Sequence, residues 1–153
     1  MTPDRVRAWG RELRLVHDAF RRQIDDLRDA ITAGRPREEF TTELRQFCLG
    51  FCSALGRHHV AEDGALFPRV AAEHPDLAPV IDRLREDHVL LGYLLADLEA
   101  VPVDAPPDEV LRHLDGIAAI MESHFSYEER SLVPVLDAMT GPDADITGLL
   151  GTG

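Results

Sequence analysis

The chain repeats one short pattern 66 residues apart. Residues 58–68 read HHVAEDGALFP and residues 124–134 read HFSYEERSLVP, so each copy has a His, a Glu four positions later, then a Leu and a Pro. On an α-helix, residues four apart share a face. Each copy therefore directs one imidazole and one carboxylate to the same side, and two copies that face each other would form a metal site.

Four long segments carry the 3.6-residue periodicity of amphipathic helices. They cover about 3–33, 37–63, 76–100 and 107–139, with a short helical stretch to 72 after the second segment and a bend near Pro134 in the fourth. Short connections between long helices favour antiparallel neighbours. The pattern predicts an all-α fold, an antiparallel up-down four-helix bundle with a pseudo-twofold repeat of one helix hairpin. No segment alternates convincingly with a period of two.

Two further histidines extend the repeat. His17 and His88 lie 71 residues apart on the first and third predicted helices, and all four histidines fall in the apolar stripes that face the core. A buried carboxylate without a partner costs several kcal/mol, and divalent cations would supply that partner. The six predicted metal ligands form two sequence halves, His17, His58 and Glu62 in one, and His88, His124 and Glu128 in the other. The alternative, a salt-bridged core without metal, is weakened because the stripes contain no Arg.

Residues beside these ligands are interpreted by aligning the two copies. His59 aligns with Phe125, so we place His59 beside the ligands or on the side of the helix rather than among them. Asp63 and Glu129 align with each other, and we interpret them as solvated helix flanks in preference to partners of the ligands. Cys48 and Cys52 lie four apart on an apolar face and are predicted to be small core residues.

Composition limits the class of protein. The 153 residues suffice for one domain, predicted over 1–140, and the Gly- and Asp-containing segment 141–153 is predicted to be a flexible tail. A net charge of −12 argues against a nucleic-acid partner. No apolar run approaches the roughly 20 residues that span a bilayer, and the N-terminus lacks the apolar part of a secretory signal. We therefore expect a cytoplasmic protein with no membrane association, and the sequence indicates no particular protein partner.

Four imidazoles with two carboxylates suit Fe, Zn, Mn or Cu rather than Ca or Mg. The ordered set of six ligands, followed by LFP and LVP, resembles the hemerythrin-like (HHE cation-binding) family in its single-domain bacterial type, over about residues 10–138. The resemblance implies a non-haem di-iron centre in a four-helix bundle. It also implies that Glu62 and Glu128 bridge the two iron ions, with the histidines as terminal ligands, and that an oxo or hydroxo group bridges the ions as well. Zinc or manganese is less favoured than iron.

The chain departs from the oxygen-carrying members at one ligand. Those proteins have a fifth His four residues after the third-helix ligand, where this chain has Gly92, and an Asp five residues after the fourth-helix His, where this chain has Glu128 at four. The departure argues against reversible O₂ carriage and for an open position that reacts with a small oxidant, H₂O₂, O₂ or NO. Catalase-like peroxide breakdown is the leading hypothesis, and the sequence identifies no general acid or base for it. The alternatives are an O₂-, NO- or iron-sensing module that binds without turnover, and a zinc-binding structural bundle.

Overall fold

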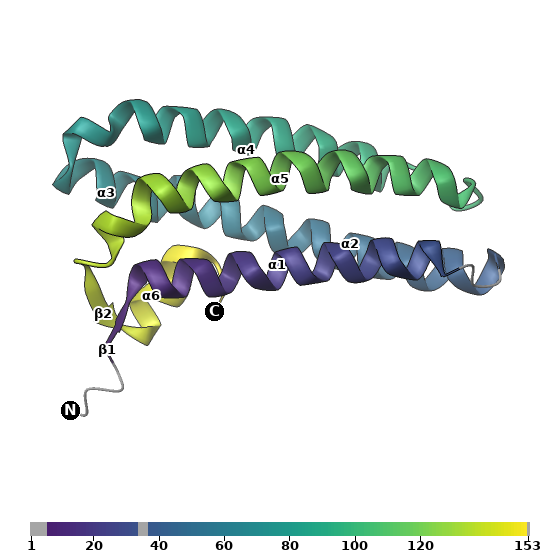
Figure 1. Cartoon of the computed structure of the whole chain (residues 1–153), viewed down its shortest axis with the longest axis horizontal. Helices are drawn as coiled ribbons and strands as arrows, with labels where there is room; N and C mark the ends of the chain where they lie inside the picture. The colour runs from purple at the N-terminus through teal and green to yellow at the C-terminus, as the bar shows by residue number, and fades with distance from the viewer. Residues whose placement is uncertain (1–5, 34–36, 153) are drawn as a thin grey trace.

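Four long helices run side by side in alternating directions (Figure 1). The computed structural model describes residues 6–33 and 37–152, with the side chains of 8–33, 45–139 and 147–152. The four helices are α1 (Trp9–Thr32), α2 (Arg37–Ala61), α4 (Ala78–Glu99) and α5 (Pro107–Leu136). This arrangement confirms the predicted all-α bundle. Within the described residues, no helix is both long and apolar enough to cross a membrane.

The second long helix does not end at the motif. It continues through a π-helical turn, Glu62–Leu66, into α3, Phe67–Glu73, and a short 3₁₀ turn, Pro75–Leu77, leads into α4. Pro68 lacks an N–H and its ring crowds the carbonyl four residues earlier, which disfavours a regular α-helix. The wider turn, in which the Phe67 N–H bonds the Glu62 carbonyl, relieves that conflict. The equivalent Pro134 lies inside α5, which remains α-helical.

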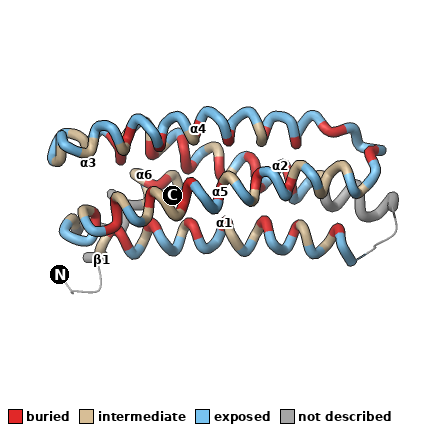
Figure 2. Tube along the Cα trace, turned by 45° about the horizontal axis from the view of Figure 1, so that its top comes forward, coloured by how far each residue is buried: buried red, intermediate tan, exposed pale blue. Residues whose placement is uncertain are grey.

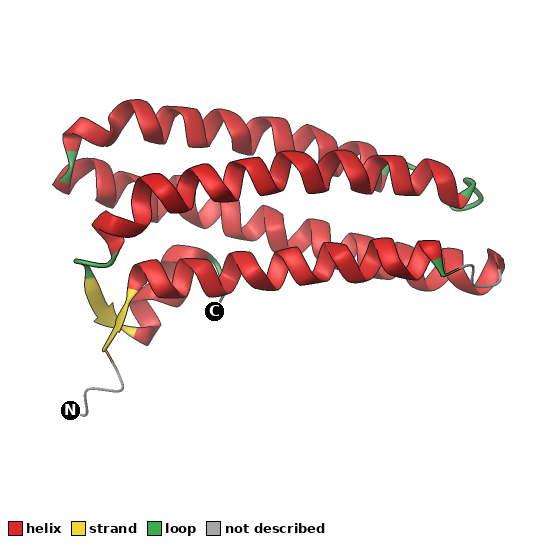
Figure 3. Cartoon of the chain, in the orientation of Figure 1, coloured by secondary structure: helices red, strands yellow, loops and turns green. Residues whose placement is uncertain are grey.

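The C-terminal segment differs from the flexible tail that the sequence predicts. A short strand β1, Val6–Ala8, pairs antiparallel with β2, Thr140–Pro142, and is followed by α6, Asp143–Leu150 (Figure 3). Three-residue strands are too short to show a period of two, so this pair has no recognisable signal in the sequence. The helix docks because Leu150 is buried in the core, and α6 packs against α1 and α2.

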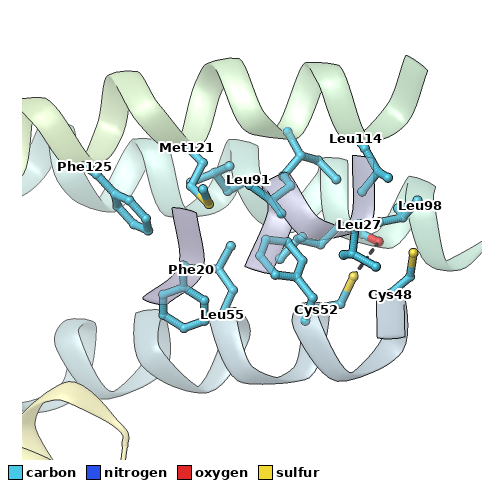
Figure 4. Close-up of a cluster of buried hydrophobic side chains, with 14 of the residues drawn as sticks. Phe20, Leu27, Cys48, Cys52, Leu55, Leu91, Leu98, Leu114, Met121 and Phe125 are labelled. Carbon is cyan, nitrogen blue, oxygen red and sulfur yellow. Dashed lines mark hydrogen bonds between the residues drawn. The ribbon is translucent and has the colours of Figure 1, made fainter. Parts of the chain in front are cut away.

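The core consists of two apolar clusters with a polar layer between them. Buried residues recur along the helices on the sides that face the interior of the bundle (Figure 2). One cluster extends from the layer, beside Phe20 and Phe125, toward the α4–α5 connection near Leu114 (Figure 4). The other fills the opposite end around Trp9, Leu13, Leu66, Phe67, Val70, Ile81, Leu84, Leu132, Val133, Leu136 and Leu150.

Both cysteines belong to the first cluster, as predicted. Cys48 and Cys52 are buried and free of any disulfide. Burial raises the pKa of Cys48 to about 11 and that of Cys52 to about 12. At neutral pH both side chains are therefore thiols that fill space, and neither is a reactive thiolate.

Candidate metal centre

Seven polar side chains, each at most 6% exposed, form the layer between the two apolar clusters. They are His17 from α1, His58 and His59 from α2, Glu62 from the π-helical turn, His88 from α4, and His124 and Glu128 from α5. Six are the ligands that the sequence predicts, and the structure brings all six together. The seventh, His59, was placed beside them by the sequence, and its ring is buried in the same layer.

The two glutamates connect histidines from both sequence halves. The Glu62 Oε1 atom lies 3.3 Å from His58 Nε2 and 3.2 Å from His88 Nε2. The Glu128 Oε1 atom lies 3.4 Å from His124 Nε2, and its Oε2 atom lies 3.6 Å from His17 Nε2. The halves are therefore interleaved, because each carboxylate contacts one imidazole from its own half and one from the other.

Each of the four predicted histidine ligands is held by its other ring nitrogen. The Nδ1 atom of His17 bonds Glu129 Oε2 at 2.7 Å, and that of His88 bonds Asp63 Oδ1 at 2.9 Å. These two bonds show that the interpretation of Asp63 and Glu129 as solvated flanks was wrong. Carboxylate oxygens accept hydrogen bonds, so both Nδ1 atoms carry the proton and both Nε2 atoms present a lone pair to the layer.

The other two orienting contacts had no recognisable signal in the sequence. His124 Nδ1 bonds Asp87 Oδ2 at 3.0 Å, and His58 Nδ1 bonds the backbone carbonyl of Leu150 at 2.7 Å. Asp87 has no counterpart in the first half, because the residue at the equivalent position is Val16. A backbone carbonyl has no side-chain pattern at all, so comparison of the two copies could not reveal either partner.

The inner atoms of the layer have no partner among the described residues. They are the Nε2 atoms of all five histidines and the four carboxylate oxygens of Glu62 and Glu128, each with under 1 Å² of accessible surface. An unsatisfied buried polar group costs about 1–3 kcal/mol. Nearly all of these atoms are lone-pair acceptors. One cation can bind several of them at once, whereas hydrogen bonding would require a separate donor group for each atom. The nearby Arg21 pairs with Glu129 and Glu122 and leaves the layer free of an internal counter-charge.

The protonation of the metal-free layer favours cation binding. Burial lowers the pKa of His58 to about 4 and that of His88 to about 3, so both imidazoles are neutral at pH 7. Burial and the neighbouring Glu128 raise the pKa of Glu62 well above its usual range. Burial alone would raise the pKa of Glu128 as well, but Glu62 and the surrounding imidazoles outweigh it and lower that pKa to about 2. Protons and divalent cations would therefore compete for the oxygen atoms of these two carboxyl groups.

Two groups of ligand atoms are compact enough to hold an ion each. One group is His17, His58 and Glu62, and the other is His59, Glu62, His88 and His124, with the ligand atoms of each group within 4.8 Å of one another. Imidazole nitrogen with carboxylate oxygen is a donor set that fits Fe, Zn, Mn or Cu. The residues therefore fit a metal centre in chemistry, burial and orientation.

A comparison with protein-family models agrees with this geometry. The model of the hemerythrin HHE cation binding domain matches residues 11–142, nearly the whole chain. The chain belongs to the hemerythrin HHE family. Searches of curated proteins and of solved structures gave no match. The HHE match ends before α6, so the Leu150 carbonyl that orients His58 lies outside the part that the family describes.

Proposed function

We propose that the HHE layer holds two iron ions and that the protein reacts with a small oxidant, with breakdown of hydrogen peroxide as its reaction. The observation that carries the proposal is the interleaving of the two halves. Each of two fully buried glutamates contacts one histidine from either half, and every inner acceptor atom lacks a partner among the described residues. Two cations that share both carboxylates would satisfy this arrangement.

The structure supports a division of the ligands between the two ions. His17 and His58 would hold one ion, His88 and His124 the other, and Glu62 and Glu128 would contact both. When bound, an iron pair would supply two-electron redox chemistry, by which one H₂O₂ is oxidised to O₂ and a second H₂O₂, with the two protons and two electrons of the first, is reduced to two waters.

The protein itself contributes orientation, exclusion of water and size selection. Each Nδ1 bond fixes the direction of an imidazole, as partners of metal-bound histidines usually do. The apolar clusters on either side of the layer keep bulk water away from it. Because no residue of the layer is more than 6% exposed, only a small molecule can reach the centre, which favours peroxide, O₂ or NO over any larger substrate.

The test is evolution of O₂ from H₂O₂ by iron-loaded protein, followed with an oxygen electrode. We expect His58→Ala to lower the rate at least about a hundredfold, since it removes one ligand of the pair and leaves the Leu150 carbonyl unpaired. The matched control is His74→Ala, a histidine in the linker after α3 that belongs to neither ligand group, and it should keep the wild-type rate.

Three results would contradict the proposal. Equal rates for His58→Ala and wild type would assign the activity to iron outside the layer. A stable spectral adduct with O₂ or NO and no O₂ evolution from peroxide would assign the layer to binding or sensing. Two zinc ions per chain without a visible charge-transfer band would assign it to a structural centre.

A further inference from the structure

His59 is the one residue of the layer that neither the motif nor the repeat explains. It is 5% exposed, and its Nε2 atom has no partner among the described residues. Its ring stacks on that of His88, with centroids 3.8 Å apart and planes at 13°, and stands at 83° to that of His124 at 5.4 Å. Its ligand atom lies within 4.8 Å of those of Glu62, His88 and His124.

The other half of the molecule shows what a ring in this place requires. Phe125, the residue equivalent to His59, stacks on His17 with centroids 3.8 Å apart and planes at 6°. A hydrocarbon ring therefore suffices to support the neighbouring histidine. A buried imidazole in its place adds a polar atom that costs free energy unless that atom has a partner. Stacking alone therefore does not explain why this position holds an imidazole and not a phenyl ring.

Position 92 does not supply a fifth imidazole, and the space there is not part of the layer. Gly92 lies on the exposed side of α4, and a Cβ atom at this position would meet no other described atom within 4 Å. The face of His88 is covered from α2 instead, by the His59 ring. The additional imidazole of the layer therefore comes from α2 and not from α4.

We propose that His59 is a metal ligand, and that its Nε2 atom binds the same ion as His88 and His124. This inference rests on the proposed dinuclear centre and deepens it. One ion would have three imidazole donors and the other, held by His17 and His58, would have two, so the centre is unequal although the fold that holds it is a repeat.

The test is an equilibrium titration with Co²⁺, followed by its visible absorption, on wild type and on His59→Phe. The Phe variant retains the stacked ring and removes only the nitrogen donors. We expect one of two cobalt equivalents to bind at least about tenfold more weakly with a changed spectrum, while the second equivalent is unchanged. His59→Ala should show the same loss, and free imidazole should restore the wild-type spectrum in this variant because the vacated space admits it.

The outcomes separate this inference from the proposed function. If wild type binds two equivalents of Co²⁺ and His59→Phe binds both with wild-type affinity and spectrum, His59 only packs on His88, and the inference is wrong while the dinuclear centre stands. If wild type itself does not bind two equivalents, the proposed dinuclear centre fails first. His74→Ala serves as the control and should titrate as wild type.

Discussion

The two repeats of this bundle place the same kinds of residue around the polar layer, with two differences. In both, an aromatic ring follows the motif histidine and stacks on the histidine of a neighbouring helix at 3.8 Å. In both, the acidic residue after the motif glutamate accepts a hydrogen bond from that same neighbouring histidine. The repeats differ in the identity of the ring, His59 against Phe125, and in what orients the motif histidine.

The second difference breaks the symmetry between the two repeats. His124 is oriented by Asp87, which precedes the α4 histidine, whereas the equivalent residue in α1, Val16, has no acceptor to offer. His58 donates instead to the backbone carbonyl of Leu150 in α6, a helix that belongs to neither repeat. Part of the metal centre has thus come to depend on a segment outside the repeat and outside the matched family domain.

The largest expected effect is acid destabilisation of the metal-free chain, with comparable contributions from both halves. Burial lowers the pKa of His58 to about 4 and of His88 to about 3, below the ordinary 6.5, so the unfolded state binds more protons below pH 6.5. Stability is therefore lost as pH falls from about 6.5 toward 3. Glu62, whose pKa burial raises, acts in the opposite direction, but the lowered pKa values of His59 and Glu128 add to the loss. We expect a loss of about 4 kcal/mol in urea unfolding between pH 7 and 4.

This prediction also compares the halves directly. His58→Gln and His88→Gln should each remove a similar part of the acid sensitivity, because each removes one buried imidazole. A pH-independent free energy of unfolding in the metal-free wild type, or sensitivity that resides in one half alone, would contradict it.

Removal of residues 143–153 is expected to have the next largest effect, and on the first half only. It exposes the apolar surface that covers Leu150 and deprives His58 of its acceptor. The free energy of unfolding should fall by about 2–5 kcal/mol, and the ion beside His17 and His58 should bind about 10–100-fold more weakly. Leu150→Ala separates the two causes, since it loses the packing and retains the carbonyl: stability should fall while metal affinity changes little. Equal losses of metal affinity in the two variants would show that packing alone is responsible.

The four helices, and the burial of the six predicted ligands in one layer, could be predicted because both depend on one signal, polar residues placed at a 3.6-residue period within apolar stripes. The burial of His59 could not. Residues 58 and 59 are about 100° apart on the helix, so both face the interior only because α2 has α1, α4 and also α6 as neighbours. The strand pair and α6 escaped prediction because three-residue strands and an eight-residue helix have too little sequence for periodicity.

Asp87→Ala is the counterpart of the C-terminal truncation in the second half. It removes the acceptor of His124 without removing a helix, so the metal effect should appear with little change in stability. We expect the affinity for one ion to fall about 10–100-fold in a competition titration against a chelating dye. A variant in which both ions bind as in wild type would show that the Asp87 contact does not orient a ligand.

The smallest expected effect tests the contact that the halves share. Asp63→Asn and Glu129→Gln keep an oxygen that accepts from the Nδ1 atoms of His88 and His17 and remove only the negative charge. Each should weaken metal binding by less than about tenfold, and by similar factors, in the same titration. Glu129 has the additional ion pair with Arg21 at 3.0 Å, so Arg21→Gln is the control for loss of that pair alone. A large effect at one position and none at the other would show that the halves are not equivalent in this contact.

The central claim is that the buried layer holds two metal ions that share Glu62 and Glu128. Elemental analysis of the protein purified from its host, combined with its visible absorption spectrum, tests it most directly. The account predicts two iron ions per chain and a charge-transfer band, both lost together in the double variant Glu62→Ala, Glu128→Ala. One ion per chain or none, or two ions that remain in the double variant, would contradict it.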